Sequence, residues 1–139
     1  MKISARNQLL GKVELIQKGK VNSEVCVKLK SGHIVASVIT NDAVDDLELK
    51  STDNVIAFFK SSCVLVSTQT HLNISARNQF NGVVSNILVG EINGLIYIDI
   101  GNNDTIVSVI TMNSIRALNI KMGINVTAII KASDVMIAK

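Results

Sequence analysis

Ile-Ser-Ala-Arg-Asn-Gln stands at residues 3–8 of this chain and stands again, unchanged, at residues 74–79. The same offset of 71 residues (74 minus 3) aligns the surrounding sequence without a gap. Gly11 falls on Gly82, and Ser-Val-Ile-Thr at 37–40 falls on the same four residues at 108–111. Chance does not give six consecutive identities together with a shared register. Each copy is therefore predicted to be one structural module.

The repeat sets the predicted domain limits. The first domain is expected at residues 1–67 and the second at residues 72–139, joined by the polar connection Thr68-Gln69-Thr70-His71. Modules of this size lie near the lower limit of independent stability. The two are therefore expected to be stabilised by contacts with each other or with other chains.

Within the first copy the pattern is mostly that of β-strands. Residues 24–29 alternate polar and apolar side chains with a period of two, as a half-buried strand does. Further strands are expected at 7–16, 34–39, 55–59 and 64–66, the last two around a tight turn at 60–62. Thr40 is a predicted N-cap of a short helix, because apolar residues follow it at Val44 and Leu47.

Five short strands with one helix after the third is the order of an OB-like barrel. The predicted fold class is therefore all-β, with two tandem OB-like five-stranded β-barrels, each with a short helix after the third strand.

Composition and charge restrict the cellular compartment and the class of partner that the sequence allows. Hydrophobic residues make up 47% of the chain, yet no apolar run approaches the roughly 20 residues of a membrane span. Residues 1–4 carry no apolar signal-peptide core, so a cytoplasmic protein without a membrane partner is expected. The net charge of +3 is a mild bias toward anionic partners. Cys26 and Cys63 form no CxxC pair and are interpreted as small apolar residues.

No grouping of catalytic type is kept in both copies. His33 aligns with an aspartate and His71 lies in the connection, so both are interpreted as surface histidines. Asp45 and Asp46 have no acidic counterparts and are interpreted as a solvated helix face. No Gly-rich phosphate loop, HExxH or GxSxG motif occurs. We therefore expect neither an enzyme nor a site for a bare metal cation.

Both copies do keep a set of hydrogen-bond donors: the Ser-Ala-Arg-Asn segment, a threonine where a helix begins, and a lysine in a turn followed by small residues. Hydroxyls, a guanidinium, an ammonium and free backbone N–H groups suit a compact tetrahedral dianion. Each donor also has an ordinary structural interpretation. Ser4 and Asn7 could satisfy strand-edge backbone, Arg6 could make a surface salt bridge, and Thr40 could be only a cap. Retention of the whole set in both copies favours a binding role.

The repeated hexapeptide resembles the opening signature of the molybdate-binding Mop domains. Residues 39–47 and 55–62, with their counterparts at 110–114 and 126–133, are similar to the rest of that pattern. The resemblance covers nearly the whole chain, twice, as in the di-domain molbindins. It implies a cytoplasmic protein for storage and homeostasis of molybdate or tungstate. It also implies a homotrimer in which six domains surround a common core and hold oxyanions between them.

Carried over position by position, the resemblance implies a set of oxyanion-binding residues. They are Ser4, Arg6, Thr40, Lys60 and Ser61 in the first copy and Ser75, Arg77, Thr111, Ser114, Lys131 and Ala132 in the second, the last through its backbone N–H. In this pattern the Ser-Ala-Arg-Asn strand of one domain meets the helix start and lysine turn of another. The first copy departs from the pattern at Ala43, which stands where the second has Ser114 and lacks its hydroxyl. A second type of site near the symmetry axis is also implied, with the Gly19 and Gly90 turns as candidates.

Two other functions stay open from the sequence. A nucleic-acid-binding OB-fold protein would stack bases on aromatic side chains, but only three phenylalanines and one tyrosine occur here, and no Lys/Arg-rich run. A structural assembly module would use the same donors for subunit contacts and would be indifferent to oxyanions.

Overall fold

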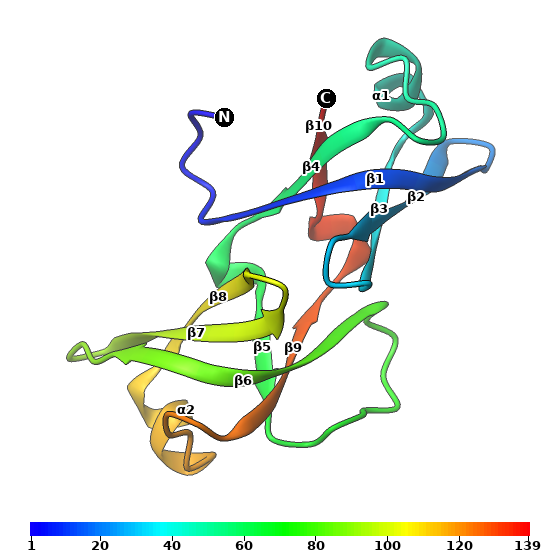
Figure 1. Ribbon diagram of the computed structural model, residues 1–139. Coiled ribbons are helices and arrows are strands. Elements are labelled where there is room, and N and C mark those ends of the chain that lie inside the picture. The colour runs from blue at the N-terminus through cyan, green and yellow to red at the C-terminus, as the bar shows by residue number, and fades with distance from the viewer.

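The computed structural model describes residues 1–139 and contains ten strands, two short α-helices and two 3₁₀ turns (Figure 1). The first repeat forms β1 (Asn7–Lys18), β2 (Asn22–Leu29), β3 (Ile34–Thr40), α1 (Asn41–Asp46), β4 (Asn54–Phe59), the 3₁₀ turn η1 (Ser61–Cys63) and β5 (Leu65–Ser67). The second repeat forms β6 (Asn78–Leu88), β7 (Asn93–Gly101), β8 (Asp104–Thr111), α2 (Met112–Ala117), β9 (Asn125–Ile130), η2 (Ala132–Asp134) and β10 (Met136–Ala138). The predicted all-β class, with a helix after the third strand of each repeat, is confirmed.

Both helices begin where the sequence places them. The hydroxyl of Thr40 accepts a hydrogen bond from the Ala43 N–H at 3.1 Å, and that of Thr111 accepts one from the Ser114 N–H at the same distance. Thr40 and Thr111 are therefore N-caps, as the sequence predicts. Neither α-helix is long or apolar enough to cross a membrane.

The last strand of each repeat joins the sheet of the other repeat. One sheet has the order β10-β4-β1-β2-β3 and the other β5-β9-β6-β7-β8. Met136 of β10 lies opposite Phe58 of β4, and Leu65 of β5 lies opposite Ile129 of β9. Figure 1 shows β10 beside β4 in one unit and β5 beside β9 in the other. The expected tight turn joining the last two strands is wrong, because η1 carries the chain across to the other sheet.

We call the sheet containing β1 the first unit and the sheet containing β6 the second unit. A single cluster of 26 buried apolar residues runs through both, and it includes Val64 and Val135, which lead into the exchanged strands. The two units therefore share one core, as the small size of each repeat predicts.

Two asparagines of the repeated hexapeptide join the units. The side chain of Asn7 donates to the carbonyl of Val107 at 2.9 Å and accepts from its N–H at 2.7 Å. Asn78 makes the matching pair of bonds with Ala36, both at 2.8 Å. Both asparagines are buried, so the structural interpretation left open for Asn7 is confirmed.

Two buried serines add a second symmetric pair of bonds. The Ser37 hydroxyl donates to the Val135 carbonyl at 2.6 Å, and the Ser108 hydroxyl donates to the Val64 carbonyl at 2.7 Å. Each bond ties a β3 or β8 strand to the segment entering an exchanged strand. This explains why the sequence keeps Ser-Val-Ile-Thr in both copies.

Candidate functional site

The Ser-Ala-Arg-Asn segment has an inward and an outward side. Ala5 and Asn7 are buried, whereas Ser4 and Arg6 are exposed. The last residue of the hexapeptide holds the backbone of the segment in place, because the Gln8 side-chain amide donates a hydrogen bond to the Ala5 carbonyl at 2.9 Å. The hexapeptide thus fixes the interface with one side and presents a hydroxyl and a guanidinium with the other.

The register of β1 and β4 places the lysine turn next to this segment. Asn7 lies opposite Phe59, so Arg6 and Lys60, the next residues outward, lie at the same end of the strand pair. Together with Ser4 and Ser61 they line a hollow of about 320 Å³. The complete lining is Ile3, Ser4, Ala5, Arg6, Phe58, Lys60, Ser61, Ser62 and Met136. Two cations and three hydroxyls with no carboxylate make this hollow suited to an anion.

The structure therefore brings together four of the five site residues expected in the first copy. The lysine turn belongs with the Ser-Ala-Arg-Asn segment of its own repeat, because β1 and β4 are paired. This differs from the expectation that the turn would come with the helix start of another domain.

The second repeat repeats the register with one change. Asn78 lies opposite Ile130, which brings Arg77 beside Lys131 and the start of η2 at Ala132. Here, however, Nη2 of Arg77 lies 3.3 Å from Oε1 of Glu24, which belongs to the first unit. The position equivalent to Glu24 in the second repeat (24 plus 71) is Leu95, so Arg6 has no corresponding carboxylate.

The helix starts lie at the other end of their own unit. The N–H of Asn41 donates to the carbonyl of Val21, at the tip joining β1 and β2. Arg6 directly precedes the first residue of β1, whereas the β1–β2 tip follows its last residue. At about 3.3 Å per residue, the two ends of β1 are roughly 35 Å apart along the strand. Thr40 therefore cannot share one hollow with Ser4 and Arg6 of the same repeat.

The helix start of one unit lies instead on the side of the other unit's Ser-Ala-Arg-Asn segment. Asn78 binds Ala36 of β3, and Arg77 contacts Glu24, whose partner in the β2–β3 register is Val38. The segment thus runs beside β3 in the direction of Thr40.

The two helix starts differ in their donors. The Thr111 hydroxyl lies 2.9 Å from the Ser114 hydroxyl, so two hydroxyls meet at the start of α2. At the start of α1, Ala43 leaves only the hydroxyl of Thr40.

Glu24 also influences a neighbouring thiol. Burial raises the pKa of Cys26, and the Glu24 carboxylate, 3.7 Å from its sulfur, raises the pKa further. Cys26 is buried, Cys63 is half-buried, and both are free thiols. No group of three or more His, Cys, Asp or Glu side chains is placed to hold a metal ion.

Several residues lie differently from the sequence interpretation. His33 is half-buried rather than a surface residue; its Nε2 lies 3.0 Å from the Ile100 carbonyl and its ring meets Phe80 edge-on. Gly19 and Gly90 sit at strand tips where a Cβ atom would overlap the carbonyl of Asn22 or Asn93. This close approach gives both glycines a structural reason, and the second type of site near the symmetry axis stays a prediction.

Comparison with known proteins identifies each of the two repeats. The family model described as the TOBE domain matches residues 3–66 and, again, residues 74–137. The molybdenum transport protein ModE of Azotobacter vinelandii is 36% identical over 138 residues, which are 99% of this chain and 51% of that protein. The chain thus spans about half the length of this relative.

Two further similarities bear on the repeat and on the fold. Molybdenum-pterin-binding protein 3 of Clostridium pasteurianum is 42% identical over 66 residues, which are 97% of that protein and 48% of this chain. The crystal structure of the cytoplasmic molybdate-binding protein ModG with molybdate bound has a TM-score of 0.95 to this fold. It is 34% identical, with 99% of both chains covered.

Proposed function

The chain belongs to the TOBE-domain family, and from that premise we propose that it binds molybdate, with tungstate as an alternative ligand. The proposed domains are the repeats at 1–67 and 72–139. The observation that carries the proposal is the hollow in which Ser4, Arg6, Lys60 and Ser61 converge without a carboxylate. Three of these residue types recur in the second repeat at Ser75, Arg77 and Lys131, whereas Ala132 stands at the position of Ser61 and offers only its backbone N–H.

This donor set suits a tetrahedral dianion of molybdate type. Arg6 and Lys60 supply two positive charges, matching the two negative charges of the ion. The hydroxyls supply directional bonds that fix the oxygens, and hydrogen bonds between ionised partners are the strong ones. Full enclosure requires donors from a second unit, because Thr40 and Thr111 lie far from the Ser-Ala-Arg-Asn segments of their own repeats. We propose that the ions lie between domains for this reason.

The proposed role is storage and homeostasis of the oxyanion in the cytoplasm, with a homotrimer presenting six domains. We propose no catalysis, because binding a stable oxyanion through hydroxyls and cations requires no nucleophile or acid–base pair. Nucleic acid and membrane are not proposed partners. The small number of aromatic residues supports the first exclusion.

The test is isothermal titration of the purified, anion-stripped protein with molybdate, with sulfate as the control ion. We expect saturable binding of one or more molybdate ions per chain and no response to sulfate. An Arg6→Ala variant should bind fewer ions or bind them more weakly, while its thermal unfolding is unchanged, because the side chain is exposed. Absence of heat and of a thermal shift with molybdate and tungstate would overturn the proposal and favour the assembly module.

A further inference from the structure

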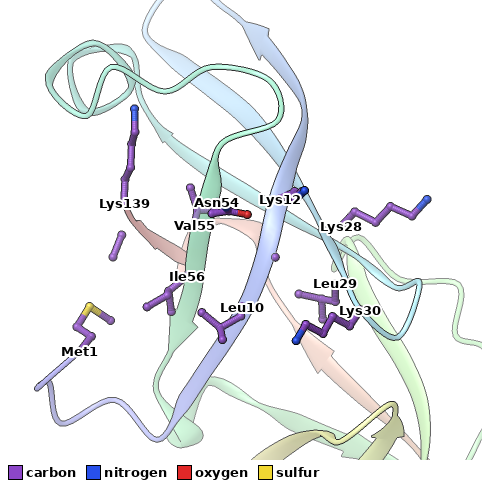
Figure 2. Close-up of a pocket in the computed structure, with 12 residues that line it drawn as sticks. Met1, Leu10, Lys12, Lys28, Leu29, Lys30, Asn54, Val55, Ile56 and Lys139 are labelled. Carbon is purple, nitrogen blue, oxygen red and sulfur yellow. The ribbon is translucent and has the colours of Figure 1, made fainter.

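A second hollow shares no lining residue with the proposed anion site, although β4 and β10 border both. It has a volume of about 740 Å³ and lies over β1, β2 and β4 of the first unit, with the end of β10 at its edge (Figure 2). Its apolar floor includes Leu10 and Ile56, which face each other in the β1–β4 register. Leu10 is 60% exposed, which is unusual for a leucine in the middle of a strand.

Lysines surround this floor. Lys12, Lys28, Lys30 and Lys139 all line the hollow, and no Asp or Glu does. Lys139 is paired with Asp53, but the other three lysines make no ion pair within the chain. Lys12 and Lys28 lie directly opposite each other in the β1–β2 register, an arrangement of like charges that is unfavourable unless an anionic group lies nearby. We call this feature the lysine groove.

The second unit has no lysine groove. At the positions equivalent to Lys12 and Lys28 it has Val83 and Asp99 (12 plus 71 and 28 plus 71). Leu10 and Ile56 are replaced by Asn81 and Thr127, and the Thr127 hydroxyl lies 2.8 Å from the Asn81 side chain and 2.6 Å from the Gln69 carbonyl. The connection between the repeats is therefore held against this position in the second unit, whereas the groove in the first unit is open.

The second unit has the complementary feature at its β6–β7 tip. Residues 88–92 (Leu-Val-Gly-Glu-Ile) form this tip, which projects from the unit (Figure 1). Val89 is 75% exposed and Ile92 is 77% exposed, and Glu91 between them makes no ion pair within the chain. The equivalent tip of the first unit carries Lys20 in place of Glu91.

We propose that the acidic, apolar β6–β7 tip of one copy of this chain docks in the lysine groove of a second copy. Val89 and Ile92 would cover the apolar floor, and Glu91 would neutralise the facing lysines. The two surfaces match in polarity and in charge, whereas the Lys20 tip would repel the groove. The contact rests on the self-association included in the proposed function and requires no bound ion.

The contact is directional, because the groove exists only on the first unit and the acidic tip only on the second. Each copy therefore offers one of each surface, and the copies join head to tail. Head-to-tail contacts close into rings when the rotation between copies allows it. A ring of three copies would account for a trimer with six domains.

Charge reversal tests the contact. The mass of the full chain is measured by sedimentation velocity over a range of concentrations, with and without molybdate. We expect assembly of the wild type without molybdate, and an assembly dissociation constant raised about tenfold or more in Glu91→Lys and in Lys28→Glu. The double variant Glu91→Lys/Lys28→Glu should recover assembly. Lys121→Glu, the same charge change as Lys28→Glu at an exposed lysine that belongs to neither surface, is the matched control and should leave the mass unchanged.

A wild type that stays monomeric, or a Glu91→Lys variant that assembles like the wild type, overturns the proposal. Loss of assembly in Lys121→Glu as well would mean a general charge effect and would also overturn it. Because Glu91 and Lys28 are exposed, far-UV circular dichroism should show an unchanged fold in each variant. Molybdate titration of the same variants separates this contact from the proposed function, since failure to bind molybdate does not bear on the mass.

Discussion

At the scale of single residues, the two arginines of the repeated hexapeptide differ in their neighbours. Arg77 is paired with Glu24 across the unit boundary, whereas Arg6 is unpaired. A carboxylate beside Arg77 competes with any anion that binds the same guanidinium. The two repeats should therefore differ in affinity even though their site residues are nearly the same.

We predict that Glu24→Gln strengthens molybdate binding at the Arg77 site about twofold to fivefold, the range expected for an exposed ion pair. Isothermal titration with a two-site analysis measures this change. Glu14→Gln, which removes an equal charge from a neighbouring strand position, serves as the control. Equal affinities in wild type and Glu24→Gln would show that Glu24 does not compete.

The Ala43 position gives a second prediction. Ala43→Ser would recreate the hydroxyl that Ser114 contributes at the start of α2. A hydrogen bond to a charged group is worth about 1.5–3 kcal/mol, so molybdate binding at the α1 start should strengthen by up to that amount. The same titration measures it, with Ser114→Ala as the reverse change. Unchanged affinity in both variants would remove the helix starts from the site.

The repeat in the sequence showed which residues matter, but it did not show what each of them does. Arg6 and Asn7 are adjacent and both recur, so the repeat marks them equally. The alternation that sends Arg6 outward and Asn7 into the interface became visible only with the β1–β4 register. His33 gave no signal of its contact with Phe80, because its partner lies in the other repeat.

At the scale of elements, the asparagine bonds hold one unit's strands against the other's. Asn78→Ala would leave the N–H and carbonyl of Ala36 buried without partners, at about 1–3 kcal/mol for each unsatisfied group. We predict a loss of about 2–5 kcal/mol in the free energy of unfolding. Chemical denaturation measures it, and Asn125→Ala, at an exposed asparagine whose side chain makes no hydrogen bond within the chain, is the control. A loss below about 1 kcal/mol would mean that water replaces the asparagine.

The loop before β4 gives a prediction for acid stability. The Lys50 backbone N–H, followed by the Lys139 ammonium, holds the pKa of Asp53 below its ordinary value. A lowered pKa in the folded state stabilises the protein above the unfolded pKa of about 3.9, and this stabilisation is lost as pH falls through the folded pKa. Asp53→Asn should therefore be less stable than wild type near neutral pH, with the difference in Tm narrowing below about pH 4. A difference independent of pH would contradict the assignment.

Strand existence was predictable from the sequence, but strand pairing was not. The alternation in β2, the cap at Thr40 and the apolar run in β4 are local signals, and each is confirmed. The choice between a hairpin at residues 60–62 and a crossing to the other unit is not local. Because β5 and β10 come from equivalent positions, either strand fits either sheet edge, and the same turn residues serve both connections.

At the scale of the whole molecule, the exchanged strands make each unit dependent on the other repeat. A fragment of residues 1–67 keeps β5 but lacks β10, the partner of β4. We predict that two such fragments pair, each giving its β5 to the open edge of the other. Sedimentation equilibrium should show twice the fragment mass and dissociation coupled to unfolding. A folded monomeric fragment would show that β5 can fold back onto its own β4.

The exchange also sets an order of events during synthesis. Chains emerge from the ribosome N-terminus first, and domains usually fold in that order. Here the second sheet needs β5 and β9, both of which are made before β10, whereas the first sheet needs β10 itself. The second sheet can therefore be completed before the first sheet. Until β10 emerges, the nascent protein carries an open β4 edge that an identical chain on a neighbouring ribosome could fill with its own β5.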